Sequence, residues 1–232
     1  MIEYPALANP IKHIANHGSD GFYTSKIAKD MLGHLKALDS LLELAGFAAT
    51  RATWIIPIAS SFASHDIVET PRPGQGLAVL IALNILKNFG LSRFEAESPE
   101  RRHSAIEVLK LAWELRNQHI ADLDFAHMPV TSLLDDEAAQ RLARPIGINK
   151  YTDTGIALPA SDAVYLTVVD KNRMSVSFIN SICFNFGVGI VTRKSGIMFQ
   201  NRGHGCSTRP DQPHRIAPAK RPLHTIIPAM VR

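Results

Sequence analysis

Several side chains near the end of the sequence are of the types that bind metal ions. Zinc sites use three or four such ligands, and their sequence signatures are short and fixed, such as HExxH or paired CxxC. The segment here is rich in Gly, Pro and Arg and contains neither signature. We therefore interpret it as a polar loop and predict no metal and no cofactor. The four residues are His204, Cys206, His214 and His224.

A second group of side chains could supply hydroxyl chemistry. Ser175, Ser177 and Ser181 lie two and four residues apart, and on a strand such residues share one face. A polar stripe of this kind is usually the solvent face of a strand. Beside a nucleophile it would instead form the wall of an active site, and spacing alone leaves both interpretations open.

The stretch PRPGQG, residues 71–76, is a turn-rich loop directly ahead of an apolar segment. A glycine-rich loop at a helix N-terminus can hold an anion because the first N–H groups of the helix have no internal partner. The stretch contains neither GxGxxG nor GxxxxGK followed by Ser or Thr, so it does not predict a nucleotide site.

The elements that would position these groups change along the chain from helices to strands. Residues 53–70 are predicted to be extended, with Pro57 at an edge or a break. Helices are predicted within 8–36, 76–90, 98–120 and 132–144, and strands at 164–169, 174–182, 196–201 and 225–231. Helices in the first half and antiparallel strands in the second predict an α+β or layered α/β fold.

Apolar faces indicate how the predicted helices pack. Ile11 and Ile14 share a face of the first helix, and Ile106, Leu109 and Trp113 share a face of the long helix within 98–120. The helix within 76–90 is apolar nearly all round and is predicted to be buried.

Composition and charge exclude several classes of protein. The chain has 232 residues, of which 46% are hydrophobic and 20% charged, as in an ordinary folded protein. Its longest apolar run, Leu77–Leu83, is too short to cross a bilayer, and no signal peptide is visible, so we expect a cytoplasmic chain. Residues 151–232 carry 10 Lys and Arg against 4 Asp and Glu, but singly spaced, so no nucleic-acid partner is predicted. Cys183 is predicted to be a small buried residue.

Several motifs, taken in order, resemble the γ-glutamyltransferase family (γ-glutamyltranspeptidase, glutathione hydrolase). They are SDAVYLTVVDKN, FNFGVGIV, SGIMFQNRG and APAKRPLHTIIPAMV in the second half, with NPIKHIANHGSDGFYTSKIAKDM and PRPGQGLAVLIALNIL upstream. Each motif is weak alone, but the ordered set is specific and spans residues 7–231.

The resemblance implies an N-terminal-nucleophile hydrolase with a partial αββα sandwich. Such proteins are made as precursors that cut themselves before a threonine. The freed α-amine, with a pKa of about 8, can then act as general base for the hydroxyl of the same residue. A γ-glutamyl group passes to that hydroxyl and then to water, an amino acid or a peptide, and backbone N–H groups stabilise the oxyanion.

The resemblance also implies roles for individual residues. It places the processing site at Asp162 and Ala163, with Ala163 at the position of the nucleophile. It assigns the hydroxyl that supports the nucleophile to Ser181. The corner KRP-x-[S or T] of the family matches Lys220–Pro222, and His224 stands where many members have a serine. The implied substrate-binding residues are Asn201, Arg202, His224 and Thr225.

The chain departs from the family pattern in three ways. Ala163 has no hydroxyl, and Gly203–Gly205 lack the acidic pair of the best-known members. The family's substrate-carboxylate arginine would lie upstream of Met1, and its oxyanion-hole glycine pair would lie beyond Arg232. We therefore expect a segment truncated at both ends that is inactive and unprocessed as it stands, and in which restoring Thr at 163 does not by itself give turnover.

The expected organisation follows the family's two subunits. Residues 1–150 correspond to the C-terminal, mostly helical part of the large subunit, 151–162 to the linker before the processing site, and 163–232 to the start of the small, β-rich subunit. The expected ligands are γ-glutamyl compounds such as glutathione, and association with a complementary chain or with itself is possible for a partial sandwich. The alternatives are a non-catalytic binding module and a non-functional gene fragment that retains the family pocket.

Overall fold

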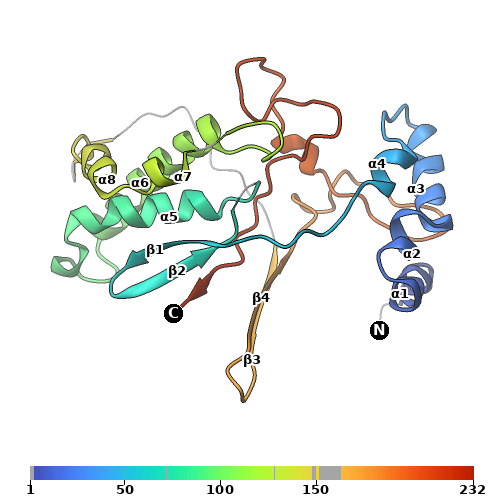
Figure 1. Cartoon of the computed structure of the whole chain (residues 1–232), viewed down its shortest axis with the longest axis horizontal. Coiled ribbons are helices and arrows are strands. Elements are labelled where there is room, and N and C mark those ends of the chain that lie inside the picture. Colours follow the sequence, from blue (N-terminus) through green and yellow to red (C-terminus); the bar gives the residue numbers. More distant parts are fainter. Residues whose placement is uncertain (1–2, 72, 128, 148–149, 152–162) are drawn as a thin grey trace. The chain divides into compact units, whose positions relative to one another are not determined.

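The computed structural model divides the chain into two compact units. One unit contains the chain up to Trp54 together with Phe184–Asn201, and the other contains Ile55–Cys183 and Arg202–Arg232. Each is described by itself below (Figure 1). The structure describes residues 3–71, 73–127, 129–147, 150–151 and 163–232.

The first unit is built on short helices. Gly18, at φ 63°, ends the first of them and satisfies the carbonyl of Ile14. Ser25 caps the third, because its hydroxyl accepts a hydrogen bond from the N–H of Ile27 at 3.1 Å. The helices are α1 (Pro5–His17), α2 (Asp20–Tyr23), α3 (Lys26–Lys36) and α4 (Leu44–Ala48).

The apolar face of α3 packs inward, whereas the apolar face of α1 is not buried. Ile27, Met31 and Leu35 of α3 are all buried. Ile11 and Ile14 of α1 are 58% and 38% exposed. The predicted helices of 8–36 are therefore confirmed, and the predicted packing face of α1 is wrong.

The returning segment Phe184–Asn201 is a loop and not the predicted strand. Within it, Val191 and Met198 form an isolated antiparallel bridge, and the N–H of Val188 donates to the carbonyl of Phe199 at 3.1 Å. Gly187, at φ 54°, lies against the carbonyl of Phe199 so closely that any side chain would overlap it. Tight turns at the glycines of FNFGVGIV bend this segment, so residues 196–201 form an isolated bridge and scattered backbone hydrogen bonds in place of a strand.

The core of the second unit is centred on α5 (Gly76–Leu86). Eight of the eleven residues of α5 are buried, which confirms the prediction of a buried helix over 76–90. It packs against the long helix α6 and against α8 (Figure 1). The other helices are α6 (Pro99–His119), α7 (Val130–Leu133) and α8 (Asp136–Ala143), with 3₁₀ turns η1 (Lys87–Phe89), η2 (Leu91–Arg93) and η3 (Arg202–Gly205). No helix in the described part of the chain is long and apolar enough to span a membrane.

Only part of the predicted apolar face of α6 packs against the core. Ile106 and Leu109 are 49% and 36% exposed, whereas Trp113 is partly buried against the core. The buried residues of the helix are Ser104, Glu107, Val108, Ala112 and Arg116. Small residues at 108 and 112 let α6 approach α5 closely, and this packing decides the buried face.

A small antiparallel sheet packs against α5 in the same unit. It has the order β1-β2-β5, from β1 (Ile58–Phe62), β2 (His65–Glu69) and β5 (Met230–Val231). Glu69 pairs with Ile58, and Met230 pairs with Val68. The predicted extended stretch of 53–70 is thus a hairpin, and the predicted strand of 225–231 is reduced to its last residues.

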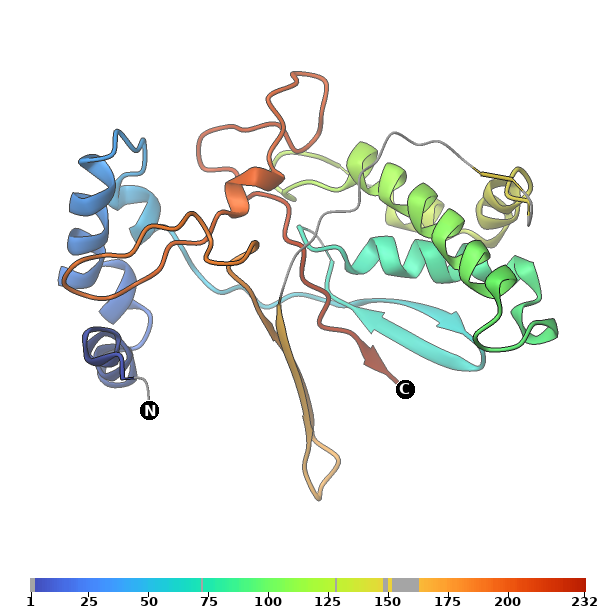
Figure 2. The same ribbon diagram turned by 180° about the vertical axis from the view of Figure 1, so that it is seen from behind.

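The predicted hairpin after residue 163 is confirmed. Strands β3 (Val164–Val169) and β4 (Ser175–Asn180) pair from Val164 with Asn180 to Val169 with Ser175 (Figure 2). The turn is closed by the carboxylate of Asp170, which accepts from the N–H of Met174 at 2.8 Å. Every residue of β3 is exposed. Helices combined with antiparallel strands confirm the predicted fold class.

Candidate active site

The position that the family motif gives to the nucleophile lies at the start of the hairpin. Ala163 is exposed and directly precedes β3. The pairing of Val164 with Asn180 ends the described ladder, and Ala163 and Ser181 are the residues that flank this pair in the sequence. Asp162, the other half of the expected processing site, lies outside the described residues. The residue without a hydroxyl and the predicted supporting serine therefore both adjoin the open end of the hairpin.

Ser181 is held in a tight turn at the end of β4. Its hydroxyl oxygen accepts a hydrogen bond from the N–H of Cys183 at 2.9 Å. Cys183 is 4% exposed, as predicted, but it has a φ of 81° and lies outside the strand. A serine hydroxyl that bonds to the backbone two residues later stabilises such a turn. Ser177, which shares the stripe, bonds to the hydroxyl of Tyr165 at 2.9 Å.

Arg202 joins the end of the hairpin to the C-terminal segment. It is 5% exposed, and its guanidinium donates to the carbonyl of Ser181 at 3.0 Å and to the hydroxyl of Thr225 at 3.4 Å. Burial lowers the pKa of Arg202, while the nearby Cys183 raises it. Three residues far apart in the sequence, all singled out by the motifs, thus meet at one buried guanidinium.

His224 lies beside this group, against the PRPGQG loop. Its N–H donates to the carbonyl of Pro73 at 2.9 Å, and residues 74 and 224 form a parallel bridge. The Nδ1 of its ring lies 2.9 Å from the carbonyl of Pro222. Burial is the main cause that lowers the pKa of His224, and the charges of Arg202 and Arg221 lower it further. The surroundings of this ring are therefore positive.

Asn201 belongs to the other compact unit. Its side-chain carbonyl accepts from the N–H of Phe184 at 2.9 Å and closes the loop of that unit. Among the described residues, this bond gives Asn201 a structural role within its own unit.

Two buried acids of this region were not found from the sequence. Glu69, at the end of β2, is 1% exposed, and burial raises its pKa to about 7. Its Oε2 would lie 2.6 Å from a Cβ placed on Gly76, so the carboxyl group lies against the start of α5. Asp122 is 2% exposed and accepts from the N–H of Arg221 at 2.7 Å, which fixes the KRP corner. Both acids stand among Pro, Gly and apolar residues, and no periodic pattern in the sequence there indicates that their side chains are buried.

Metal ligation finds no support in this part of the molecule. Across the described residues, no three His, Cys, Asp or Glu side chains are grouped so that they could hold a metal ion. The pKa of His214 is lowered, chiefly by burial, and the pKa of Cys206 is raised by burial.

The combination of helices and antiparallel strands agrees with the fold class that the motifs imply, that of N-terminal-nucleophile hydrolases. The family model described as gamma-glutamyltranspeptidase matches residues 1–232. This chain belongs to the γ-glutamyltranspeptidase family.

Three known proteins illustrate the similarity. A glutathione hydrolase-like proenzyme of Bacillus subtilis (strain 168) is 34% identical over 97% of this chain and 43% of its own length. An oxamate amidohydrolase proenzyme of Klebsiella pneumoniae is 33% identical over 98% of this chain and 43% of its own length. The crystal structure of a cephalosporin acylase from Bacillus halodurans superposes with a TM-score of 0.86 at 32% identity, covering 97% of this chain and 41% of that one. The chain thus spans less than half the length of the proteins it matches.

Proposed function

We propose that this chain is a segment of a γ-glutamyltransferase or glutathione hydrolase-type protein and that it is inactive and unprocessed as it stands. The reaction of the whole protein would be transfer of a γ-glutamyl group to water or to an amino acid or peptide acceptor. The observation that supports the proposal is the alanine at position 163, directly ahead of the hairpin β3–β4, where the family motif has a threonine.

The chemistry of the reaction explains why alanine in place of threonine at position 163 is expected to abolish activity. A threonine here would supply a hydroxyl for the acyl shift that cuts the precursor and, after cutting, an α-amine as base. The methyl side chain of Ala163 can neither attack the preceding peptide bond nor accept an acyl group. Neither processing nor turnover is therefore expected from this chain.

The group around Arg202 would hold the acyl donor in this proposal. The guanidinium of Arg202 already links the end of the hairpin to Thr225. Arginine matches a carboxylate through parallel N–H donors, so Arg202 would orient the carboxylate of the donor, with the hydroxyl of Thr225 and the ring of His224 beside it. Asn201 would complete the binding stretch, as the resemblance implies.

The range of acyl donors is wider in the family than γ-glutamyl compounds alone. The names of two similar proteins refer to an oxamate amide and to a cephalosporin. γ-Glutamyl compounds such as glutathione are the donors we propose to test first.

Self-cleavage tests the proposal because it needs no added substrate. The chain as given should run as a single band near 25.5 kDa on a denaturing gel. Ala163→Thr should produce two fragments that meet between residues 162 and 163, identified by mass spectrometry. Ala163→Val, which has the shape of threonine without its hydroxyl, is the matched control and should stay intact. Fragments from the unmodified chain, or equal cleavage in both variants, would contradict the proposal.

A non-catalytic binding module is the second candidate, because the contacts of Arg202 are present although the nucleophile is absent. Calorimetry with glutathione separates the candidates when combined with release of p-nitroaniline from γ-glutamyl-p-nitroanilide. Binding without turnover that is lost in Arg202→Met would favour the module. A circular-dichroism melt of the variant shows whether it is folded. If the chain shows neither binding nor turnover, the remaining alternative is a non-functional gene fragment.

Association with a complementary chain or with a second copy of itself is a further part of the proposal, and only the second can be tested with the chain alone. The hairpin exposes apolar side chains such as Leu166 and Phe178, at 43% and 51%. Exposed apolar patches of this kind commonly mark interfaces. Light scattering after size exclusion should give a mass above 25.5 kDa, and a monodisperse monomer with a sharp, cooperative melt would count against it.

A further inference from the structure

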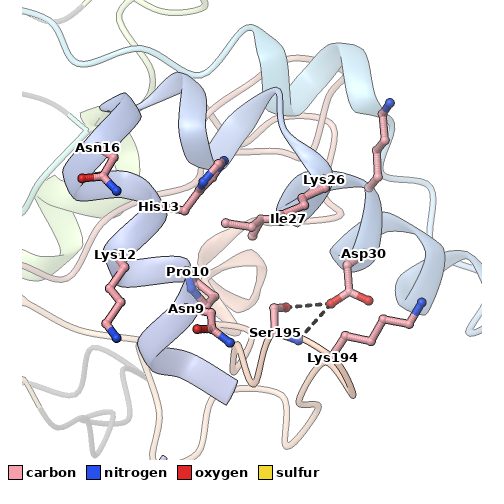
Figure 3. Close-up of a pocket in the computed structure, with 11 residues that line it drawn as sticks. Asn9, Pro10, Lys12, His13, Asn16, Lys26, Ile27, Asp30, Lys194 and Ser195 are labelled. Atoms are coloured by element: carbon pink, nitrogen blue, oxygen red, sulfur yellow. Dashed lines mark hydrogen bonds between the residues drawn. The ribbon is translucent and has the colours of Figure 1, made fainter. Parts of the chain in front are cut away.

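A cavity of about 740 Å³ lies in the first unit, apart from the residues of the candidate active site. Residues of α1 and α3 line it together with Lys194 and Ser195 of the returning segment (Figure 3). Its volume falls within the range of about 300–1,000 Å³ that is usual for small-molecule sites.

The wall between α3 and the returning segment is fixed in the absence of a ligand. The carboxylate of Asp30 accepts two hydrogen bonds from Ser195, at 3.1 Å from its N–H and 2.7 Å from its hydroxyl (Figure 3). The hydroxyl of Ser195 also lies 2.6 Å from that of Thr192. Ile27 and Ser195 are 5% and 7% exposed. A preformed wall reduces the conformational entropy that the protein loses when a ligand binds.

The charge around the cavity is strongly positive. Four lysines line it: Lys12 from α1, Lys26 and Lys29 from α3, and Lys194. In the described part of the chain, none of them makes an ion pair or a side-chain hydrogen bond. Asp30 is the one carboxylate among the lining residues, and its Oδ2 is already engaged by Ser195.

A histidine, His13 of α1, also lines the cavity. Partial desolvation, followed by the charges of His17 and Lys26, lowers its pKa. A neutral imidazole can still donate one hydrogen bond, so His13 adds a donor to the ammonium groups.

We propose that this cavity binds a small multivalent oxyanion, a polyphosphate or a polycarboxylate. Several ammonium groups on flexible four-carbon stems can reach over the opening from three sides and contact different oxygens of one anion. A monovalent anion would engage only one of them. The proposal is independent of acyl transfer, and Ala163 has no part in it.

Calorimetry at low ionic strength tests the proposal, with tripolyphosphate and citrate as the two multivalent probes and acetate as the monovalent control. We expect binding of at least one multivalent probe and none of acetate at the same concentration. Whichever probe binds more tightly identifies the source as phosphate or carboxylate. Loss of one ammonium contact should weaken binding about tenfold in Lys26→Gln and in Lys194→Gln.

Two matched variants separate a built site from general attraction to a basic surface. Lys36→Gln removes an exposed lysine of the same helix that does not line this cavity, and should leave the affinity unchanged. Asp30→Asn removes the only negative charge of the lining and should tighten binding, a gain that misfolding cannot produce. The proposal is overturned if neither multivalent probe binds, if acetate binds as tightly, or if Lys36→Gln weakens binding as much as Lys26→Gln.

Discussion

Glu69 predicts an unusual pH dependence of stability, and Glu69→Gln is the variant that tests it. The carboxyl group is buried at the end of β2 beside the start of α5, and burial raises its pKa to about 7, although the N–H of Thr70 lowers it somewhat. Protonation is therefore favoured in the folded state. Glutamine keeps the shape of the protonated acid and stays neutral at every pH.

The sign and the size of the effect follow from the two states of the chain. Below the ordinary value of 4.5 Glu69 is protonated both folded and unfolded, and its contribution to stability is fully present. As the pH rises towards about 7, the unfolded chain ionises while the folded chain holds its proton, so folding loses free energy. At about 1.36 kcal/mol per pH unit, the difference between 4.5 and about 7 amounts to about 3 kcal/mol. Above pH 7 the loss is complete.

Urea unfolding between pH 4.5 and 8, followed by tryptophan fluorescence, measures this loss. Trp113 packs partly buried against the core of the second unit, whereas Trp54 is fully exposed, so the signal reports mainly on the unit that contains Glu69. Glu69→Gln should gain about 3 kcal/mol relative to the unmodified chain as the pH rises through this range.

Taking the difference between the two proteins cancels the titration of all other groups. Glu95→Gln, at an exposed position, is the control and should leave the pH dependence unchanged. Parallel curves for Glu69→Gln and the unmodified chain would refute the reasoning. So would a gain for the variant at low pH in place of high pH.

Three further substitutions test the packing. Gly76→Ala would place a Cβ 2.6 Å from Oε2 of Glu69 and should cost about 1–3 kcal/mol in urea unfolding, whereas Gly33→Ala, with nothing within 4 Å of its Cβ, should not destabilise. Ser195→Ala removes a buried hydroxyl that contacts Asp30 and Thr192. It should lower the free energy of unfolding of the first unit by about 1–3 kcal/mol, measured by a thermal melt followed by circular dichroism. Asp135→Ala removes the cap of α8 and should cost about 1 kcal/mol by the same assay; an unchanged midpoint would show that water replaces the cap.

The helices and the hairpin could be predicted because their signals are local. Period-two alternation and a polar turn located β3 and β4, and an all-apolar segment located α5. The face of α6 could not be predicted this way. Periodicity assumes that charged residues face water, but Glu107 is buried and bonded to Lys110 at 2.6 Å, while Ile106 remains half exposed. The partner helix decided that face.

The ordered motifs selected the residues of the candidate site, whereas the contacts between these residues could not be predicted. The motifs selected Ser181, Arg202 and Thr225, but only the folded chain shows that one guanidinium contacts the other two. Glu69 gave no signal, because a single acid at the end of a strand and before a proline-rich loop resembles a surface residue. Burial of such a group depends on how α5 approaches β2, which no sequence window contains.

The exposure of β3 has a consequence for motion on slow timescales. Its backbone pairs only with β4 in the described sheets, and the hydroxyl of Tyr165 reaches the carbonyl of Ala229 at 3.2 Å. Opening the hairpin breaks few contacts with the core, so its amide protons should exchange with deuterium long before those of α5. The open end of the hairpin, where residue 163 lies, would then be only transiently ordered. A partner that covers the hairpin should slow this exchange, and deuterium uptake by residues 164–180 measures how firmly the nucleophile position is held.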